Sequence, residues 1–119
     1  MTDLANRRCG PCNAETAPIE GKELERYREH LHPRWRVVDD HHLSARYEFK
    51  DFAQALDFTN RIGAVAEAEG HHPELSLSWG WVKVKLWTHA IDGLSENDFI
   101  LAAKIDQLEG ATAAGGTAG

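Results

Sequence analysis

Three histidines and a carboxylate within residues 67–98 are the side chains of this sequence that could act together in chemistry. His71 and His72 precede Pro73, and a proline favours an extended backbone for the residue before it. Neighbouring side chains of an extended segment point to opposite sides, so one imidazole can face a pocket while the other contacts a different surface. Glu67 lies one helical turn before His71, where it can orient an imidazole or raise its pKa.

His89 is the third histidine of this group, and it ends a segment, 82–89, in which apolar and polar residues alternate. Such alternation is typical of a half-buried strand, and pairing with the strand after Pro73 would fold His89 back towards His71 and His72. An imidazole has a pKa near ~6.5, so it can donate or accept a proton near neutrality. Three histidines around an open position would also suit a catalytic zinc ion, although adjacent histidines on an extended backbone rarely bind one ion. The spacing favours acid–base chemistry and leaves a zinc-dependent hydrolase as an alternative.

The other histidines and the two cysteines carry weaker signals. We expect a solvated turn or a helix end to account for the remaining histidines, which are His30, His32, His41 and His42. Cys9 and Cys12 form a CxxC pair, which could be a redox pair, half of a zinc site or inert local structure. No strand precedes Cys9 as a thioredoxin-like site would require, so inert structure is the favoured interpretation.

Composition restricts the class of protein. The chain has 119 residues, 42% of them hydrophobic and 27% charged, which fits one globular domain. Its net charge of -6 disfavours nucleic acid as a direct ligand, because phosphate binding relies on clustered Lys and Arg. No apolar run approaches the ~20 residues that span a bilayer, and the first residues lack the apolar core of a signal peptide. These features predict a cytoplasmic protein without membrane contact.

The elements that position the histidines can be read from periodicity. A helix is expected over about 21–31, strands over 34–39 and 43–49 around a turn at 40–42, and a long helix from Asp51 to Gly70. Two further strands follow Pro73, and Ser95 with Asp98 caps a last helix. The prediction is an α+β fold of order αββαββα, a four-stranded antiparallel sheet with three helices on one face. Residues 1–18 would form an arm, 19–109 the domain and 110–119 a flexible tail.

The long helix is expected to bury one stripe and to present a second small, apolar face to a neighbouring subunit. The expected buried stripe consists of Phe52, Ala55, Leu56, Thr59, Ile62 and Ala66. Gly70 stands where a left-handed residue would end the helix.

The spacing of these residues resembles the signature of the pterin-4a-carbinolamine dehydratases. The matching residues are Glu67, His71, His72, Pro73, Trp79, His89 and Asp98. The segments CGPC near the start, 52–67 and GLSENDF at 93–99 are also similar to bacterial members. The sequence departs from many relatives at Gly70, where an acidic or amide residue is common, and at Leu75, where an aromatic residue is common.

The resemblance implies a dehydratase, a lyase that converts a 4a-hydroxytetrahydropterin to quinonoid dihydropterin and so recycles the tetrahydrobiopterin-type cofactor of aromatic amino acid hydroxylases. It implies that His71 and His89 act as general acid and base and that His72 holds the substrate. By the same resemblance the substrate-binding residues would be Glu67, Gly70, Pro73, Trp87, Thr88 and Ala90. Neither a metal nor a redox cofactor is implied, and Asp98 is left as the cap of the last helix.

The resemblance also implies a homodimer or homotetramer formed through sheet pairing and the long helix, and a functional link to an aromatic amino acid hydroxylase. Some animal members bind a homeodomain transcription factor as a dimerisation cofactor. An interaction protein without relevant catalysis is therefore a second alternative.

Overall fold

The computed structural model describes residues 4–10, 16–108 and 110–111. Its order is α1 (Gly21–Glu29), β1 (Arg36–Val38), β2 (His42–Glu48), α2 (Phe52–Glu69), β3 (Glu74–Ser78), β4 (Trp81–Leu86) and α3 (Glu96–Asp106). Two short 3-10 helices, η1 (Leu4–Asn6) and η2 (His89–Ile91), accompany this series. The predicted α+β order αββαββα is therefore confirmed. Cys12 and most of the predicted tail lie outside the described residues.

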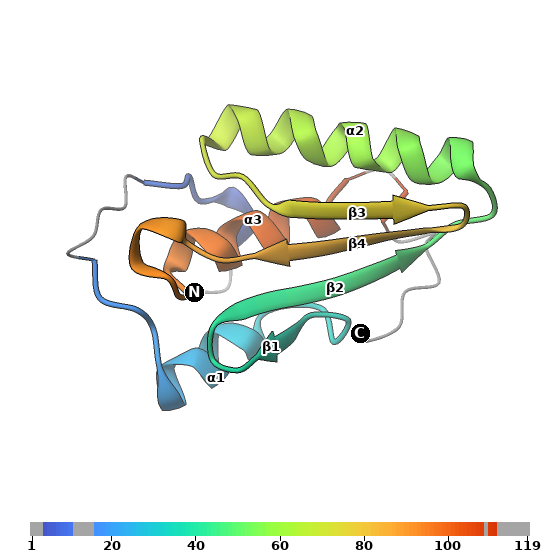
Figure 1. Ribbon diagram of the computed structural model, residues 1–119. Coiled ribbons are helices and arrows are strands. Elements are labelled where there is room, and N and C mark those ends of the chain that lie inside the picture. The colour runs from blue at the N-terminus through green and yellow to red at the C-terminus, as the bar shows by residue number, and fades with distance from the viewer. Residues whose placement is uncertain (1–3, 11–15, 109, 112–119) are drawn as a thin grey trace.

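The four strands form one antiparallel sheet in the order β1-β2-β4-β3, with α3 behind the sheet and α2 running along β3 (Figure 1). Leu43 pairs with Leu86 and Leu75 pairs with Val84, so the apolar residues of neighbouring strands share one face. Val82, Val84 and Leu86 of β4 are fully buried, whereas the alternating Lys83 and Lys85 are only partly buried. Burial of this single face against the helices is the main stabilisation of the sheet.

Helix α2 begins and ends as its sequence predicts. Asp51 accepts a hydrogen bond from the Gln54 backbone N–H at 2.9 Å, and Gly70 closes the helix in the left-handed conformation with φ 66°. The predicted stripe is partly wrong, because Phe52 and Leu56 are 45% and 42% exposed. The residues that face the core are Ala55, Phe58, Ile62 and Ala66, a row with the helical spacing of three and four residues.

A partly buried polar group joins the sheet to the end of α3. The Asp106 carboxylate accepts hydrogen bonds from the Tyr47 hydroxyl at 2.6 Å and from the Trp35 indole N–H at 2.9 Å. The Arg34 guanidinium lies 3.6 Å from the same carboxylate and stacks over the Tyr47 ring. Burial and the Asp106 charge raise the pKa of Tyr47, so its hydroxyl remains a donor. These contacts fix α3 against β2.

Two boundaries near the predicted site differ from expectation. The β1–β2 turn is made by Asp39 and Asp40, both at φ 53°, and His42 is the first residue of β2 rather than part of the turn. β4 ends at Leu86, because Thr88 forms only an isolated bridge with Gly93 and His89 begins η2.

None of the helices in the described segments is long and apolar enough to cross a membrane.

Candidate active site

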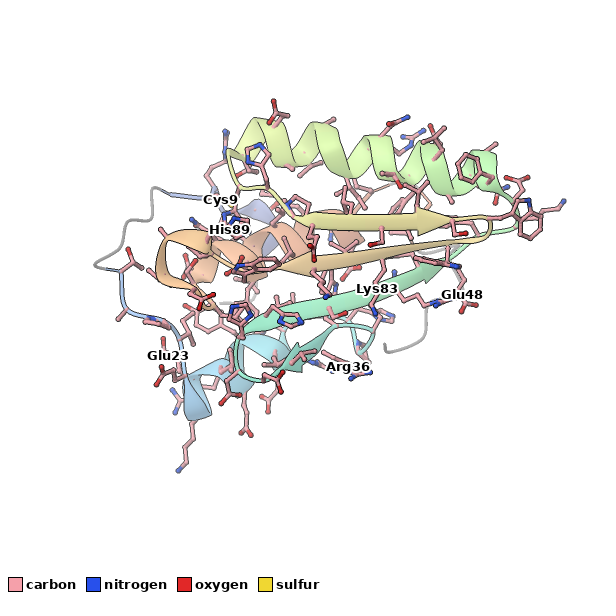
Figure 2. All side chains as sticks on the ribbon, viewed as in Figure 1. Cys9, Glu23, Arg36, Glu48, Lys83 and His89 are labelled. Carbon is pink, nitrogen blue, oxygen red and sulfur yellow. The ribbon has the colours of Figure 1, made fainter. Side chains whose placement is uncertain are left out.

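A cavity of about 360 Å³ lies where the chain leaves α2 and where β4 leads into η2. Its walls come from the turn after α2, the end of β4, η2, α3 and the N-terminal arm. The lining residues are Gly10, Gly70, His71, His72, Trp87, Thr88, His89, Ala90 and Asn97. Figure 2 shows His89 and Cys9, the residue before Gly10, at this same end of the molecule. The volume is within the range of about 300–1,000 Å³ that is usual for small-molecule sites.

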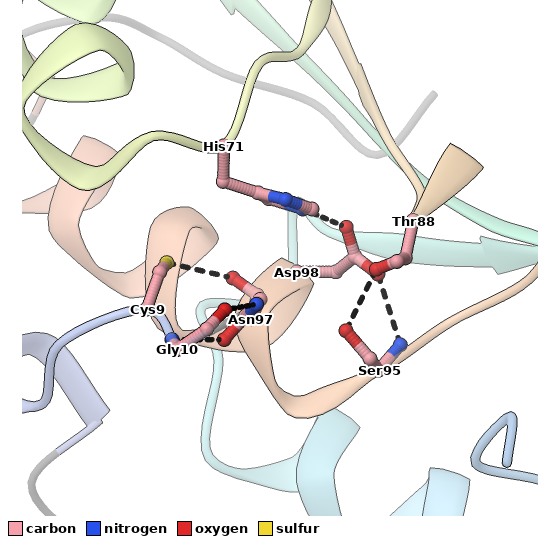
Figure 3. A network of polar contacts seen from close by, with 7 residues as sticks. All are labelled: Cys9, Gly10, His71, Thr88, Ser95, Asn97 and Asp98. Atoms are coloured by element: carbon pink, nitrogen blue, oxygen red, sulfur yellow. Dashed lines mark hydrogen bonds and ion pairs between the residues drawn. The ribbon is translucent and has the colours of Figure 1, made fainter. Parts of the chain in front are cut away.

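His71 is held by a buried carboxylate. Its Nε2 lies 2.6 Å from Oδ1 of Asp98, and the two side chains are 12% and 0% exposed (Figure 3). An ionised Asp98 accepts this hydrogen bond from Nε2–H, which leaves Nδ1 as the nitrogen of His71 that can gain or lose a proton. With Asp98 ionised, this contact holds the orientation of the His71 ring and favours the tautomer that is protonated at Nε2.

The second oxygen of Asp98 organises the start of α3. Oδ2 accepts hydrogen bonds from the Thr88 hydroxyl at 2.9 Å and from the Ser95 backbone N–H at 3.0 Å. The Ser95 side chain accepts from the Asp98 backbone N–H, which completes a capping box. The Thr88 and Ser95 hydroxyls are 2.7 Å apart. The predicted cap is confirmed, but the expectation that Asp98 has only this role is wrong, because the same carboxylate holds His71.

His72 is paired with a different carboxylate. Its Nε2 is hydrogen-bonded to Oε2 of Glu67, on the last turn of α2. Both side chains are exposed, at 60% and 78%. The expected orienting role of Glu67 thus falls on His72 rather than on His71, because the left-handed Gly70 turns the chain and directs His71 towards α3.

His89 lies against an aromatic ring. Its imidazole and the Trp87 indole have centroids 4.5 Å apart and ring planes inclined by 37°. His89 is exposed, whereas Trp87 is partly buried. The indole offers the cavity a flat apolar surface next to an imidazole, which suits a planar heterocycle.

The N-terminal arm closes one side of the cavity. The Gly10 backbone N–H donates to Oδ1 of Asn97 at 3.0 Å, and Asn97 Nδ2 donates to the Gly10 carbonyl at 2.6 Å. The Cys9 backbone N–H donates to Glu69 at 2.8 Å, and its thiol donates to the Asn97 carbonyl at 3.6 Å. Burial, then the Glu69 and Asp98 charges, raise the pKa of the Cys9 thiol to about 12, so it is a poor nucleophile.

Comparison with known proteins identifies the family. Residues 17–108 match the family model described as pterin 4 alpha carbinolamine dehydratase. The chain belongs to this family.

Individual relatives agree. A protein of Alkaliphilus metalliredigens, named as a candidate pterin-4-alpha-carbinolamine dehydratase, is 52% identical over 92% of this chain and 98% of its own length. One of Rubrobacter xylanophilus, with the same name, is 47% identical over 91% of this chain and 100% of its own length. These matches confirm the resemblance read from the sequence and the prediction of a pterin-directed lyase.

Two solved structures share the fold. The transcriptional coactivator/pterin dehydratase from Brucella melitensis is 29% identical, with a TM-score of 0.71 over 76% of this chain and 97% of the other. A pterin dehydratase-like protein described as a RuBisCO assembly factor in the alpha-carboxysome is 28% identical, with a TM-score of 0.56 over 65% of this chain and 90% of the other.

Most of the residues predicted for the site do line the cavity, namely His71, His72, His89, Gly70, Trp87, Thr88 and Ala90. Glu67 and Pro73 are not among the lining residues, although Glu67 reaches the site through His72. Gly10 and Asn97 were not predicted, because the arm has no periodicity and its docking depends on contacts across 87 residues of sequence.

The described residues contain no group of three or more His, Cys, Asp or Glu side chains arranged to hold a metal ion.

A larger cavity of about 530 Å³ lies elsewhere, between the end of β2 and the first half of α2. Its lining residues are Glu48, Phe49, Lys50, Gln54, Asp57, Phe58, Arg61 and Gly110. These include no histidine, and Arg61 and Asp57 are paired with each other at 2.9 Å. The three imidazoles favour the smaller cavity as the place for proton-transfer chemistry.

Proposed function

We propose that this protein dehydrates a 4a-hydroxytetrahydropterin to quinonoid dihydropterin and water by metal-free histidine acid–base catalysis. The observation that carries the proposal is that His71, hydrogen-bonded to the buried Asp98, lines the same cavity as the exposed His89. Membership of the dehydratase family supports the substrate class.

The reaction needs two proton movements and no redox change. The C4a–O bond breaks as the departing hydroxyl is protonated, and the N5–H proton is removed as the C4a=N5 double bond forms. One imidazole of the pair His71 and His89 supplies the first proton, and the other accepts the second. Positioned acid–base groups of this kind typically contribute about 10²- to 10⁴-fold in rate.

The remaining residues bind and orient the ring in this proposal. His72, oriented by Glu67, would hold a polar edge of the pterin. The Trp87 indole would contact the flat face, and the backbone at Gly70 and Ala90 would complete the pocket. The Asp98 carboxylate keeps Nδ1 of His71 available for proton transfer.

The test is the decay of a 4a-hydroxypterin formed by an aromatic amino acid hydroxylase, followed by absorbance with and without the purified protein. We expect acceleration without added metal. The double variant His71→Gln with His89→Gln should remove it, since glutamine can still donate to Asp98 but cannot exchange a proton at neutral pH. His30→Ala, at the exposed end of α1, is the matched control and should retain full activity. Absence of acceleration by the unaltered protein would refute the proposal.

We further propose a cytoplasmic homo-oligomer linked functionally to such a hydroxylase. Support comes from the position of β3 at the edge of the sheet and from the exposed Phe52 and Leu56 on α2. An interaction role is the second candidate function, and its support is that the two solved structures named above are described as a coactivator and as an assembly factor. The activity assay separates the two candidates.

A further inference from the structure

The three imidazoles at the cavity are held in different ways. His71 is hydrogen-bonded to Asp98, and His72 is hydrogen-bonded to Glu67. Within the described part of the chain, no side chain hydrogen-bonds the His89 ring, and the ring in contact with it is that of Trp87 at 4.5 Å. The Trp87 indole is therefore the side chain through which the orientation of His89 can be controlled.

The Trp87 ring packs against two histidines of the β1–β2 hairpin, His41 and His42. The register that pairs Leu43 with Leu86 places His42 opposite Trp87 one step further along the strands. The centroid of the Trp87 ring lies 6.2 Å from that of His42 and 5.6 Å from that of His41. These two histidines belong to no motif that the proposed reaction uses.

His41 also forms a solvent-exposed hydrogen bond with the other end of the segment that carries His89. Its Nε2 lies 2.7 Å from Oδ1 of Asp92, the residue that closes η2. The Asp92 backbone N–H in turn donates to the His89 carbonyl at 3.2 Å. His41 thus contacts residues 87 and 92, on both sides of His89.

The position of His41 is itself defined by the hairpin. Asp39 and Asp40 both adopt φ 53°, and the His41 backbone N–H donates to the Val38 carbonyl at 2.9 Å, which closes a tight turn. Nδ1 of His41 lies 3.1 Å from Nδ1 of His42. Burial, and then the neighbouring His41 and Lys85, lower the pKa of His42 and so favour its uncharged ring. An uncharged His42 can form one N–H···N hydrogen bond with His41.

We propose that His41 is a positioning residue: it holds Trp87 and Asp92 so that the Trp87 indole orients His89 in the cavity. The catalytic consequence rests on the proposed dehydratase function, whereas the orientation of His89 can be measured without it.

The first experiment is ¹H NMR of the His89 ring protons in the full-length protein, assigned by their loss in His89→Gln. A ring stacked on an indole has upfield-shifted protons, and Trp87→Leu should remove that shift. We expect His41→Ala to move these protons towards the Trp87→Leu positions and His30→Ala to leave them unchanged. Unchanged His89 signals in a folded His41→Ala protein would overturn the proposal. The outcome does not depend on enzymatic activity, so an inactive protein would refute the proposed function alone.

The second experiment is kinetic. His41→Ala should lower kcat by about two- to tenfold, the range expected from loss of one aromatic contact, with a smaller change in KM. His41→Phe retains a ring against Trp87 and should recover part of this loss, while His41→Gln retains only a donor to Asp92. In a His89→Gln background the effect of His41→Ala should disappear, because the residue that it positions is absent. Equal losses in both backgrounds would show that His41 stabilises the fold without positioning His89.

Discussion

Asp98 serves two parts of the molecule with its two carboxylate oxygens. Oδ1 holds His71, while Oδ2 accepts from Thr88 and from the start of α3. The side chain is fully buried, so both sets of contacts are shielded from water and are stronger than they would be at the surface. The geometry of the predicted proton carrier is thus tied to the stability of a helix.

Replacing Asp98 with asparagine should separate its effect on His71 from its effect on the stability of α3. The introduced side chain can still accept from Ser95 and Thr88 through its carbonyl oxygen, but its amide nitrogen would then face Nε2 of His71 and favour the opposite tautomer. We expect kcat of Asp98→Asn in the dehydration assay to fall by about 10²-fold or more, the usual scale for a misdirected general acid or base. The free energy of unfolding, measured with urea, should fall by only about 1–3 kcal/mol.

Asp51→Asn provides the control for this prediction, since Asp51 caps α2 and is not among the residues that line the cavity. It should leave kcat unchanged. If Asp98→Asn retained normal kcat, the assigned hydrogen bond between Asp98 and His71 would have no part in catalysis.

The role of Asp98 was only half predictable. Its spacing from Ser95 is a local signal and was enough to predict the cap. Its contact with His71 joins residues 27 positions apart and depends on the path of the chain through β3, β4 and η2. The capping box accounted for Asp98 on its own, so nothing in the sequence indicated that Asp98 also contacts His71.

At the level of elements, the end of α2 determines where the histidines go. Gly70 adopts φ 66°, and the His71 backbone N–H donates to the Ala66 carbonyl at 3.2 Å, so the helix stops and the chain turns into the site. A Cβ at Gly70 would meet no atom within 4 Å. A side chain at position 70 would therefore lower the free energy of unfolding only through the left-handed backbone conformation that it has to adopt.

Gly70→Ala should lower the free energy of unfolding by about 1 kcal/mol, and Gly70→Asn by less, because asparagine tolerates the left-handed region. Gly63→Ala is the matched control within α2: it also has open space for a Cβ but lies inside the helix, so it should stabilise by up to about 1 kcal/mol. Urea unfolding of Gly70→Ala, Gly70→Asn and Gly63→Ala measures whether each change lowers or raises the free energy of unfolding. Destabilisation of equal size at both glycines would contradict the assignment of the cost to φ at Gly70.

The elements themselves were largely predictable, but the order of strands in the sheet was not. Alternation predicts β2 and β4 because one face of each is buried, yet alternation does not say which strands are neighbours. The order β1-β2-β4-β3 brings the β1–β2 hairpin next to the end of β4. The contact between His41 and Trp87 follows from that order. Because the sequence does not reveal the strand order, it predicted only a solvated turn for His41 and His42.

At the scale of the whole molecule, the N-terminal arm joins elements that are far apart in sequence. Glu69, at the end of α2, accepts from the Cys9 backbone N–H at 2.8 Å and pairs with Arg8 at 3.2 Å and Lys104 of α3 at 3.8 Å. The Glu69 side chain is only 7% exposed. The arm, α2 and α3 therefore share one carboxylate beside the cavity wall formed by Gly10.

The charge on Glu69 should make arm docking sensitive to acid. The Cys9 backbone hydrogen bond, with Lys104 and Arg8, lowers the pKa of Glu69 from its ordinary value of 4.5. A group whose pKa is lowered on folding stabilises the folded state above its unfolded pKa, and that contribution is lost as the pH falls through the folded pKa. The contribution should be complete at neutral pH and decline below about pH 4.5.

Glu69→Gln tests this coupling, because glutamine can still accept from Cys9 but carries no charge. We expect a loss of about 1 kcal/mol in the free energy of unfolding at neutral pH, and a shallower decline between about pH 5 and pH 3 than in the unaltered protein. Glu25→Gln, at an exposed position of α1, should leave the slope unchanged. Parallel pH profiles for Glu69→Gln and the unaltered protein would mean that the arm is held by its backbone and Asn97 contacts alone, so acid would not release it from the wall of the cavity.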